Sequence, residues 1–108
     1  MYSKEDIINF INNFKNRVKN TNEVENLFLN GNCYYFAIIL KSRFPKMDII
    51  YSTIDNHFMC LYDYHIYDIR GDITNIKSIY DLYLWDNYKN FDKTHYKRII
   101  KYCINLDK

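Results

Sequence analysis

Cysteine is scarce in this sequence: there are three, an odd number, and no two of them form a CxxC pair. This pattern argues against a disulfide framework and against a structural zinc site. The chain also has no apolar run of 18 residues and no signal-peptide core in its polar N-terminus. These absences predict a reduced, cytoplasmic protein without a membrane partner, in which a nucleophilic thiol stays reactive.

Strong net charge and chain-breaking residues are scarce as well. The formal net charge of +2 is too small to indicate nucleic-acid binding. With 2 glycines and 1 proline, no linker, repeat or low-complexity tract divides the 108 residues, and we expect a single domain over residues 1–108. The scarcity of Gly, Pro and Ala, beside abundant Asn, Ile, Lys and Tyr, is typical of an AT-rich genome. We interpret it as a sign of origin and not of function.

Aromatic residues are plentiful instead, at 19%, and hydrophobic residues reach 48%, which excludes disorder as the dominant state. Apolar residues at helical spacing predict an amphipathic helix from Ser3 to about Asn20, followed by a short helix that begins near Asn22. A third helix is expected from Cys33 to about Phe44, where the following proline stops it. Its apolar residues cover most of its circumference, so we expect it to be the buried centre of the core.

The next stretch reads as three antiparallel strands, Met47–Thr53, His57–Tyr62 and His65–Ile69, the last two joined by a tight turn at Asp63-Tyr64. A two-residue loop pairs Tyr62 with His65 and Cys60 with Tyr67. Side chains alternate along a strand, so this register predicts that His57 and Asp68 share a face, roughly 7 Å apart on the diagonal, while Cys60 points to the other face. A further helix is expected from Thr74 or Asn75 to Trp85-Asp86. The segment from Asp92 onward favours a helix, with a strand as the alternative because of its β-branched residues.

Cys33 carries the functional prediction. Asn32 is a favoured N-cap residue, so Cys33 is expected in the first helical turn, where unpaired N–H groups and the helix dipole stabilise a thiolate. With His57 as base and Asp68 to orient the base, it forms the set of groups used in nucleophilic catalysis. The alternative is that Cys33 is a packing residue, since free cysteine is often buried.

The stretch from Gly31 to Gly71 resembles the papain-like cysteine peptidase superfamily, and within it the transglutaminase-like branch. The matching pieces are Gly31-Asn32-Cys33 with Ala37 one turn on, the strand that begins at His57, and Tyr67-Asp68 followed by Arg70-Gly71. The resemblance implies an α+β fold with helices packed on a small antiparallel sheet of about three strands. It also implies a Cys-His-Asp catalytic triad.

Further site residues follow from the same arrangement. The Cys33 backbone N–H is expected to be the first oxyanion donor, with the side chain of Asn32 or Tyr34 as the second. Arg70 lies beside His57 in the predicted register, and either holds a substrate carboxylate or carbonyl or forms a salt bridge with Asp72 or Asp55. No metal and no cofactor is expected, because a zinc site built on Cys33, His57 and Asp68 lacks close ligand pairs and a fourth ligand.

These features predict a cysteine-nucleophile hydrolase or acyltransferase that acts on an amide or thioester bond. Little chain remains for substrate-selecting loops, so the expected substrate is a protein or peptide presented as a surface. The alternative is a non-catalytic papain-like interaction module, such as a phage-encoded inhibitor of a host protein or nucleoprotein complex. A basic stripe near the C-terminus would suit acidic partners, but we interpret it as a solvated helix face and not as a nucleic-acid surface; its residues are Lys93, Lys97, Arg98 and Lys101.

Overall fold

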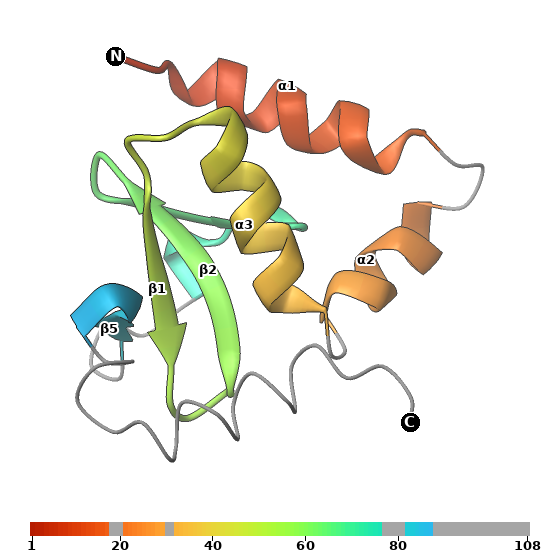
Figure 1. The fold of residues 1–108 in the computed structure, drawn as a ribbon. Coiled ribbons are helices and arrows are strands. Elements are labelled where there is room, and N and C mark those ends of the chain that lie inside the picture. Colours follow the sequence, from red (N-terminus) through yellow and green to blue (C-terminus); the bar gives the residue numbers. More distant parts are fainter. Residues whose placement is uncertain (18–20, 30–31, 77–81, 88–108) are drawn as a thin grey trace.

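The computed structural model describes residues 1–17, 21–29, 32–76 and 82–87. Within them the chain is α+β, with one antiparallel sheet of five strands in the order β4-β3-β2-β1-β5. The first and third helices contact the sheet, and the second packs on these two helices (Figure 1). The expected class, helices on a small antiparallel sheet, is confirmed, and the sheet has two more strands than the sequence predicted.

Helices α1 (Lys4–Lys15) and α2 (Thr21–Leu29) correspond to the first two expected helices. The N-cap of α1 is Ser3, whose hydroxyl accepts the Asp6 backbone N–H at 3.0 Å, as the capping pattern predicts. On the inner face of α1, Ile7 and Ile11 are fully buried. The helix is therefore held by its apolar face as well as by its cap.

Helix α3 (Cys33–Arg43) begins and ends close to the expected positions, with Asn32 at the N-cap and Phe44 at the C-cap. The side chain of Asn32 does not cap the helix. Its Nδ2 donates instead to the carbonyl of Leu27 at 3.0 Å, which ties the end of α2 to the start of α3. The first turn of α3 therefore keeps backbone N–H groups that this side chain does not occupy.

The five strands are β1 (Asp48–Ser52), β2 (His57–Tyr62), β3 (His65–Asp68), β4 (Gly71–Asp72) and β5 (Leu82–Leu84). The predicted register of the β2–β3 hairpin is confirmed, and its pairs are Cys60 with Tyr67, Leu61 with Ile66 and Tyr62 with His65. Asp63 and Tyr64 both have positive φ, 50° and 67°, as a type I′ turn between twisted strands requires.

The helix expected from Thr74 or Asn75 to Trp85-Asp86 is wrong for Leu82–Leu84, although the residues that follow, 85–87, are helical. A 3-10 turn covers Thr74–Ile76, and Leu82–Leu84 forms β5, which pairs antiparallel with β1. The edge of β1 offers a row of backbone donors and acceptors, and satisfying them outweighs a helical spacing of apolar residues. The helix expected after Asp92 lies outside the described residues.

The core lies on both faces of the sheet. The larger cluster joins α1 and α3 to β1, β2 and β3, and Cys60 belongs to it, with its thiol donating to the carbonyl of Ala37 at 3.4 Å. A smaller cluster on the other face contains Ile50, Met59 and Ile66. Cys60 and Met59 therefore point in opposite directions, as the predicted alternation requires.

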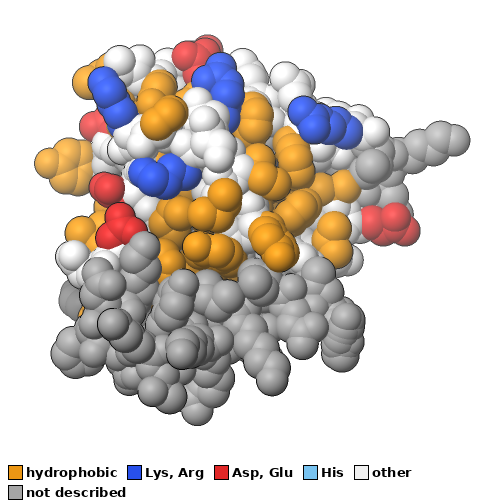
Figure 2. Space-filling view, viewed as in Figure 1, with side chains coloured by type: hydrophobic (Ala, Val, Ile, Leu, Met, Phe, Trp, Pro, Cys, Tyr) orange, Lys and Arg blue, Asp and Glu red, His pale blue; other side chains and the backbone are white. Residues whose placement is uncertain are grey.

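Hydrophobic side chains also remain at the surface. On the face shown in Figure 2 they gather across the middle of the molecule, over α3, with Lys and Arg side chains around them. Two residues of α3, Tyr35 and Ile38, are 44% and 39% exposed. The outer side of α3 is therefore partly apolar.

Candidate active site

Cys33 is the first residue of α3 and is 4% exposed. The first turn of α3 and the start of β2 lie at the same end of the sheet (Figure 1). His57, the first residue of β2, forms a side-chain hydrogen bond with Cys33 across this end of the molecule. The nucleophile and the base, 24 positions apart in the sequence, are thus brought together by the packing of α3 on the sheet.

The third expected member of the site is also in place. His57 Nε2 lies 2.9 Å from Asp68 Oδ2, and the two residues are only 8% and 3% exposed. Asp68 is the last residue of β3, on the strand next to His57, and the contact confirms that both side chains share one face. His57 thus contacts Asp68 directly, and its interaction with Cys33 is one of the causes that raise its pKa.

The electrostatics of this group follow from its burial and its partners. Burial alone would lower the pKa of His57, but hydrogen bonds and charge interactions with Asp68 and Cys33 outweigh it and raise the pKa from 6.5 to about 9. Burial alone would raise the pKa of Asp68, but hydrogen bonds from His57 and Arg70 hold it below its usual value. The pair is therefore an imidazolium and a carboxylate at neutral pH.

Arg70 has a partner that the sequence did not predict. The expected carboxylates were Asp72 and Asp55, but Arg70 Nη2 donates to Asp68 Oδ2 at 2.6 Å. Its Nε lies 3.0 Å from the same oxygen. The register prediction placed Arg70 beside His57, and the Asp68 carboxylate forms hydrogen bonds with both of these cations.

The expected second oxyanion donors have other contacts. The Asn32 amide donates to Leu27, as described above. The ring of Tyr34 packs against Phe58 and Trp85, with centroids 4.8 Å and 6.3 Å away. Cys33 is the first residue of α3, and the role of its backbone N–H as an oxyanion donor stays a prediction.

A second histidine–carboxylate pair lies on β3 and the edge strand β4, and the sequence analysis did not predict it. His65 Nδ1 is 2.9 Å from Asp72 Oδ2, and the same oxygen accepts from Lys4 Nζ at 3.0 Å. Burial would raise the pKa of Asp72, but hydrogen bonds from Thr74, Lys4 and His65 outweigh it and lower the pKa. The signal was present in a second two-residue turn, Ile69-Arg70, which pairs Tyr67 with Asp72.

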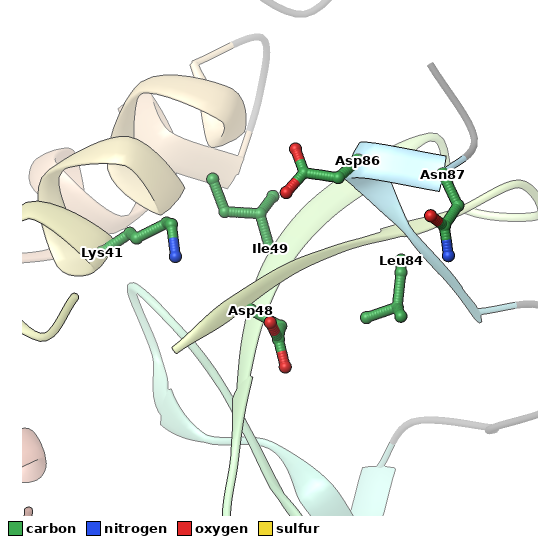
Figure 3. Close-up of a pocket in the computed structure, with 6 residues that line it drawn as sticks. All are labelled: Lys41, Asp48, Ile49, Leu84, Asp86 and Asn87. Atoms are coloured by element: carbon green, nitrogen blue, oxygen red, sulfur yellow. The ribbon is translucent and has the colours of Figure 1, made fainter. Parts of the chain in front are cut away.

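A pocket of about 240 Å³ lies beside the C-terminal half of α3, away from Cys33 (Figure 3). Its lining residues are Lys41, Asp48, Ile49, Leu84, Asp86 and Asn87. The Lys41 ammonium donates to the carbonyls of Pro45 and Met47, at 3.0 Å and 2.6 Å, so it helps to end α3. None of the three candidate catalytic residues lines this pocket.

Two other features bear on the class of the site. In the part of the chain that the structure describes, no group of three or more His, Cys, Asp or Glu side chains is arranged to hold a metal ion. Within that same part, no helix combines the length and apolar character needed to cross a membrane.

Comparison with known proteins places the chain in a family. A search of curated proteins and one of solved structures return no match. The family model described as "Phage YunG-like protein" matches residues 10–104, which is most of the chain and includes all three candidate catalytic residues. This family is phage-related, in keeping with the expectation of a phage-encoded protein. The chain belongs to the Phage YunG-like protein family.

Proposed function

We propose that this protein is a cysteine-nucleophile hydrolase or acyltransferase that acts on an amide or thioester bond in a protein or peptide substrate. The observation that carries the proposal is the buried chain Cys33, His57, Asp68, in which His57 Nε2 lies 2.9 Å from the carboxylate. The papain-like and transglutaminase-like resemblance supports it through the same chain order, cysteine, histidine, aspartate. In this proposal Cys33 attacks, His57 transfers protons and Asp68 orients His57.

In this proposal each nitrogen of the imidazole has its own task. Asp68 binds Nε2, so Nδ1 is the nitrogen left to face Cys33. The Cys33 thiolate attacks the substrate carbonyl, the C–S bond forms, and the negative charge moves to the carbonyl oxygen near the Cys33 N–H. The substrate's own bond, C–N in an amide or C–S in a thioester, then breaks as His57 gives its proton to the leaving group.

The second half of the reaction returns the enzyme to its starting state. His57, now neutral, takes a proton from water or from an acceptor amine, which attacks the acyl thioester and releases Cys33 as thiolate. Water completes a hydrolysis and an amine completes an acyl transfer.

The small exposure of the site limits the form of the substrate. Cys33 is 4% and His57 8% exposed, so only a small part of either side chain meets a ligand from outside. A bond that projects from a protein surface, or from the end of an extended chain, suits this narrow access better than a long bound segment does.

Thiol alkylation tests the proposal without a known substrate. We expect iodoacetamide at pH 6 to label Cys33 at least about 100-fold faster than Cys60, because the helix terminus and His57 favour a thiolate at Cys33. Cys60 is fully buried, and burial raises its pKa to about 12, so it serves as the internal control. Site-resolved mass spectrometry in a Cys103→Ser background measures both rates. His57→Ala should move Cys33 labelling to higher pH, and equal slow labelling at both sites would sink the proposal.

The pH profile of acylation gives a second test. Because His57 is protonated below about pH 9, acylation of Cys33 by an aryl amide should proceed at neutral pH and decline above pH 9, as the general acid is lost. An aryl ester, whose leaving group needs no proton, should show no such decline. Intact-mass measurement of the acyl-enzyme follows both probes. Identical profiles for the two probes would contradict the assignment of His57 as the acid.

The second candidate is a non-catalytic interaction module that blocks a host protein or nucleoprotein complex. It is favoured by the hydrophobic side chains that gather over α3 on the face shown in Figure 2, by the exposure of Tyr35 and Ile38 on α3, and by the phage-related family. In this case Cys33→Ser should keep activity in host cells, whereas the double variant Tyr35→Asp, Ile38→Asp should lose it. The enzyme proposal expects the opposite result for Cys33→Ser.

A further inference from the structure

Arg70 holds Asp68 from two sides. Its backbone N–H donates to Asp68 Oδ1 at 2.7 Å, and its guanidinium reaches both oxygens, with Nε 3.2 Å from Oδ1 and Nη2 2.6 Å from Oδ2. The short turn that follows β3 makes this possible, because it brings residue 70 back over residue 68. Gly71, with φ of 109°, ends the turn in a conformation that other residues rarely adopt.

The Asp68 carboxylate is therefore constrained beyond its contact with His57. Oδ2 accepts from His57 Nε2 at 2.9 Å and from the Arg70 guanidinium, and Oδ1 accepts from the backbone N–H and the Nε of Arg70. Rotation of the carboxylate would break all of these bonds together. Such a set of charge-assisted bonds fixes the direction from which His57 is held.

We infer that Arg70 is a positioning residue of the proposed reaction: it clamps the Asp68 carboxylate in the orientation and the ionised state that hold His57 against Cys33. This inference rests on the proposed function and deepens it. It also differs from a role in substrate binding, which would need the guanidinium to turn away from Asp68. Arg70 acts through Asp68 and touches no reacting atom.

The surrounding charges explain why a cation is needed here. Asp68 is 3% exposed, and a buried carboxyl group without cationic partners takes up a proton more readily. Its facing charges are His57 on β2 and Arg70 on the turn, and Cys33 on α3 acts on it through His57. Asp55 and Glu25 act electrostatically on Arg70 itself. Without Arg70, His57 would be the one cation left in direct contact with Asp68 among these groups.

The shape of the arginine side chain matters as well as its charge. A planar guanidinium presents Nε and Nη2 side by side, and both reach the same carboxylate here. A lysine in this position supplies one point charge and cannot make the paired contact. Arg70→Lys should therefore keep part of the constraint on the Asp68 carboxylate. Arg70→Met, which has a side chain of similar length without charge, should remove this constraint.

The test compares Arg70→Met and Arg70→Lys with the wild type. NMR titration of the Asp68 carboxyl carbon and of the His57 ring nitrogens reports protonation and tautomer without any turnover. In Arg70→Met we expect the proton affinity of Asp68 to rise about tenfold, since one arginine neighbour changes the protonation of an aspartate by at least that factor. Iodoacetamide labelling of Cys33 should then be lost at a correspondingly higher pH. Arg70→Lys should fall between the two.

Lys4→Met is the matched control, because it removes a cation from the other carboxylate of the sheet, Asp72, at 3.0 Å. It should leave Asp68, His57 and Cys33 unchanged. An unchanged Asp68 titration in a folded Arg70→Met or Arg70→Lys protein would overturn the inference, and a raised KM alone would assign Arg70 to substrate binding. If the Asp68 titration moves while Cys33 is unreactive in every variant, the clamp stands and the proposed function fails.

Discussion

Asp68→Asn should lower the rate of acyl-enzyme turnover about 10²- to 10⁴-fold while the protein stays folded. The amide has nearly the shape of the carboxylate, but it carries no charge to stabilise the imidazolium and no longer fixes which ring nitrogen bears the proton. His57 Nε2 lies 2.9 Å from Asp68 Oδ2, so the lost interaction is direct. Time-resolved intact mass with an aryl ester probe would measure acylation and deacylation of Cys33 separately.

The matched control for this variant is Asp72→Asn. Asp72 also lies 2.9 Å from a histidine ring, that of His65, but is no part of the proposed site. Turnover should stay within about twofold of the wild type, as for a substitution away from the reacting groups. Cys33→Ser should give no acyl-enzyme at all. A turnover that survives Asp68→Asn as well as it survives Asp72→Asn would exclude Asp68 from the mechanism.

Asp68→Ala should reduce the free energy of unfolding by about 3 kcal/mol near pH 6 to 7, because it leaves a buried histidine and an arginine without their common anion. Asp68 is 3% exposed, and its side chain accepts from both. Urea denaturation followed by circular dichroism would give the free energies. Asp48→Ala, at an exposed position where β1 begins, should change the free energy of unfolding by no more than about 0.5 kcal/mol.

The difference in the free energy of unfolding between the wild type and Asp68→Ala should depend on pH in a known direction. The pKa of Asp68 lies below its unfolded value of 3.8, so its contribution to stability is present above pH 3.8 and is lost as the pH falls through the folded pKa. The gap between the wild type and Asp68→Ala should therefore narrow at pH 3 or below. A gap that widens in acid would show that Asp68 is protonated in the folded protein.

Much of the local structure could be predicted from the sequence. The hairpin is the clearest case: a two-residue turn and strict alternation leave one register that buries the apolar face, and that register places His57 and Asp68 together. The first and third helices were predicted because Ser3 and Asn32 occupy cap positions and Pro45 stops a helix. These features depend on neighbours within a few residues, which a linear pattern records directly.

Other features were outside the reach of such patterns. The helical spacing around Tyr83 predicted a helix, but pairing with β1 made Leu82–Leu84 a strand, because an open sheet edge lies far away in the sequence. The Asn32 side chain was expected near the oxyanion, but it bonds Leu27 at the end of α2. Arg70 was predicted to bind substrate or to form a salt bridge with Asp72 or Asp55. The turn after β3 places it in a salt bridge with Asp68 instead.

The sequence by itself thus determined the parts of the candidate site: a cysteine at a helix start, and a histidine and an aspartate on one face of a hairpin. Only the tertiary structure decided that these parts meet, since the packing of α3 on the sheet brings Cys33 to His57. It also decided that Asp68 is shared between two cations. The physical reason is that backbone periodicity is a local property, whereas burial and charge pairing depend on which surfaces the whole chain brings into contact.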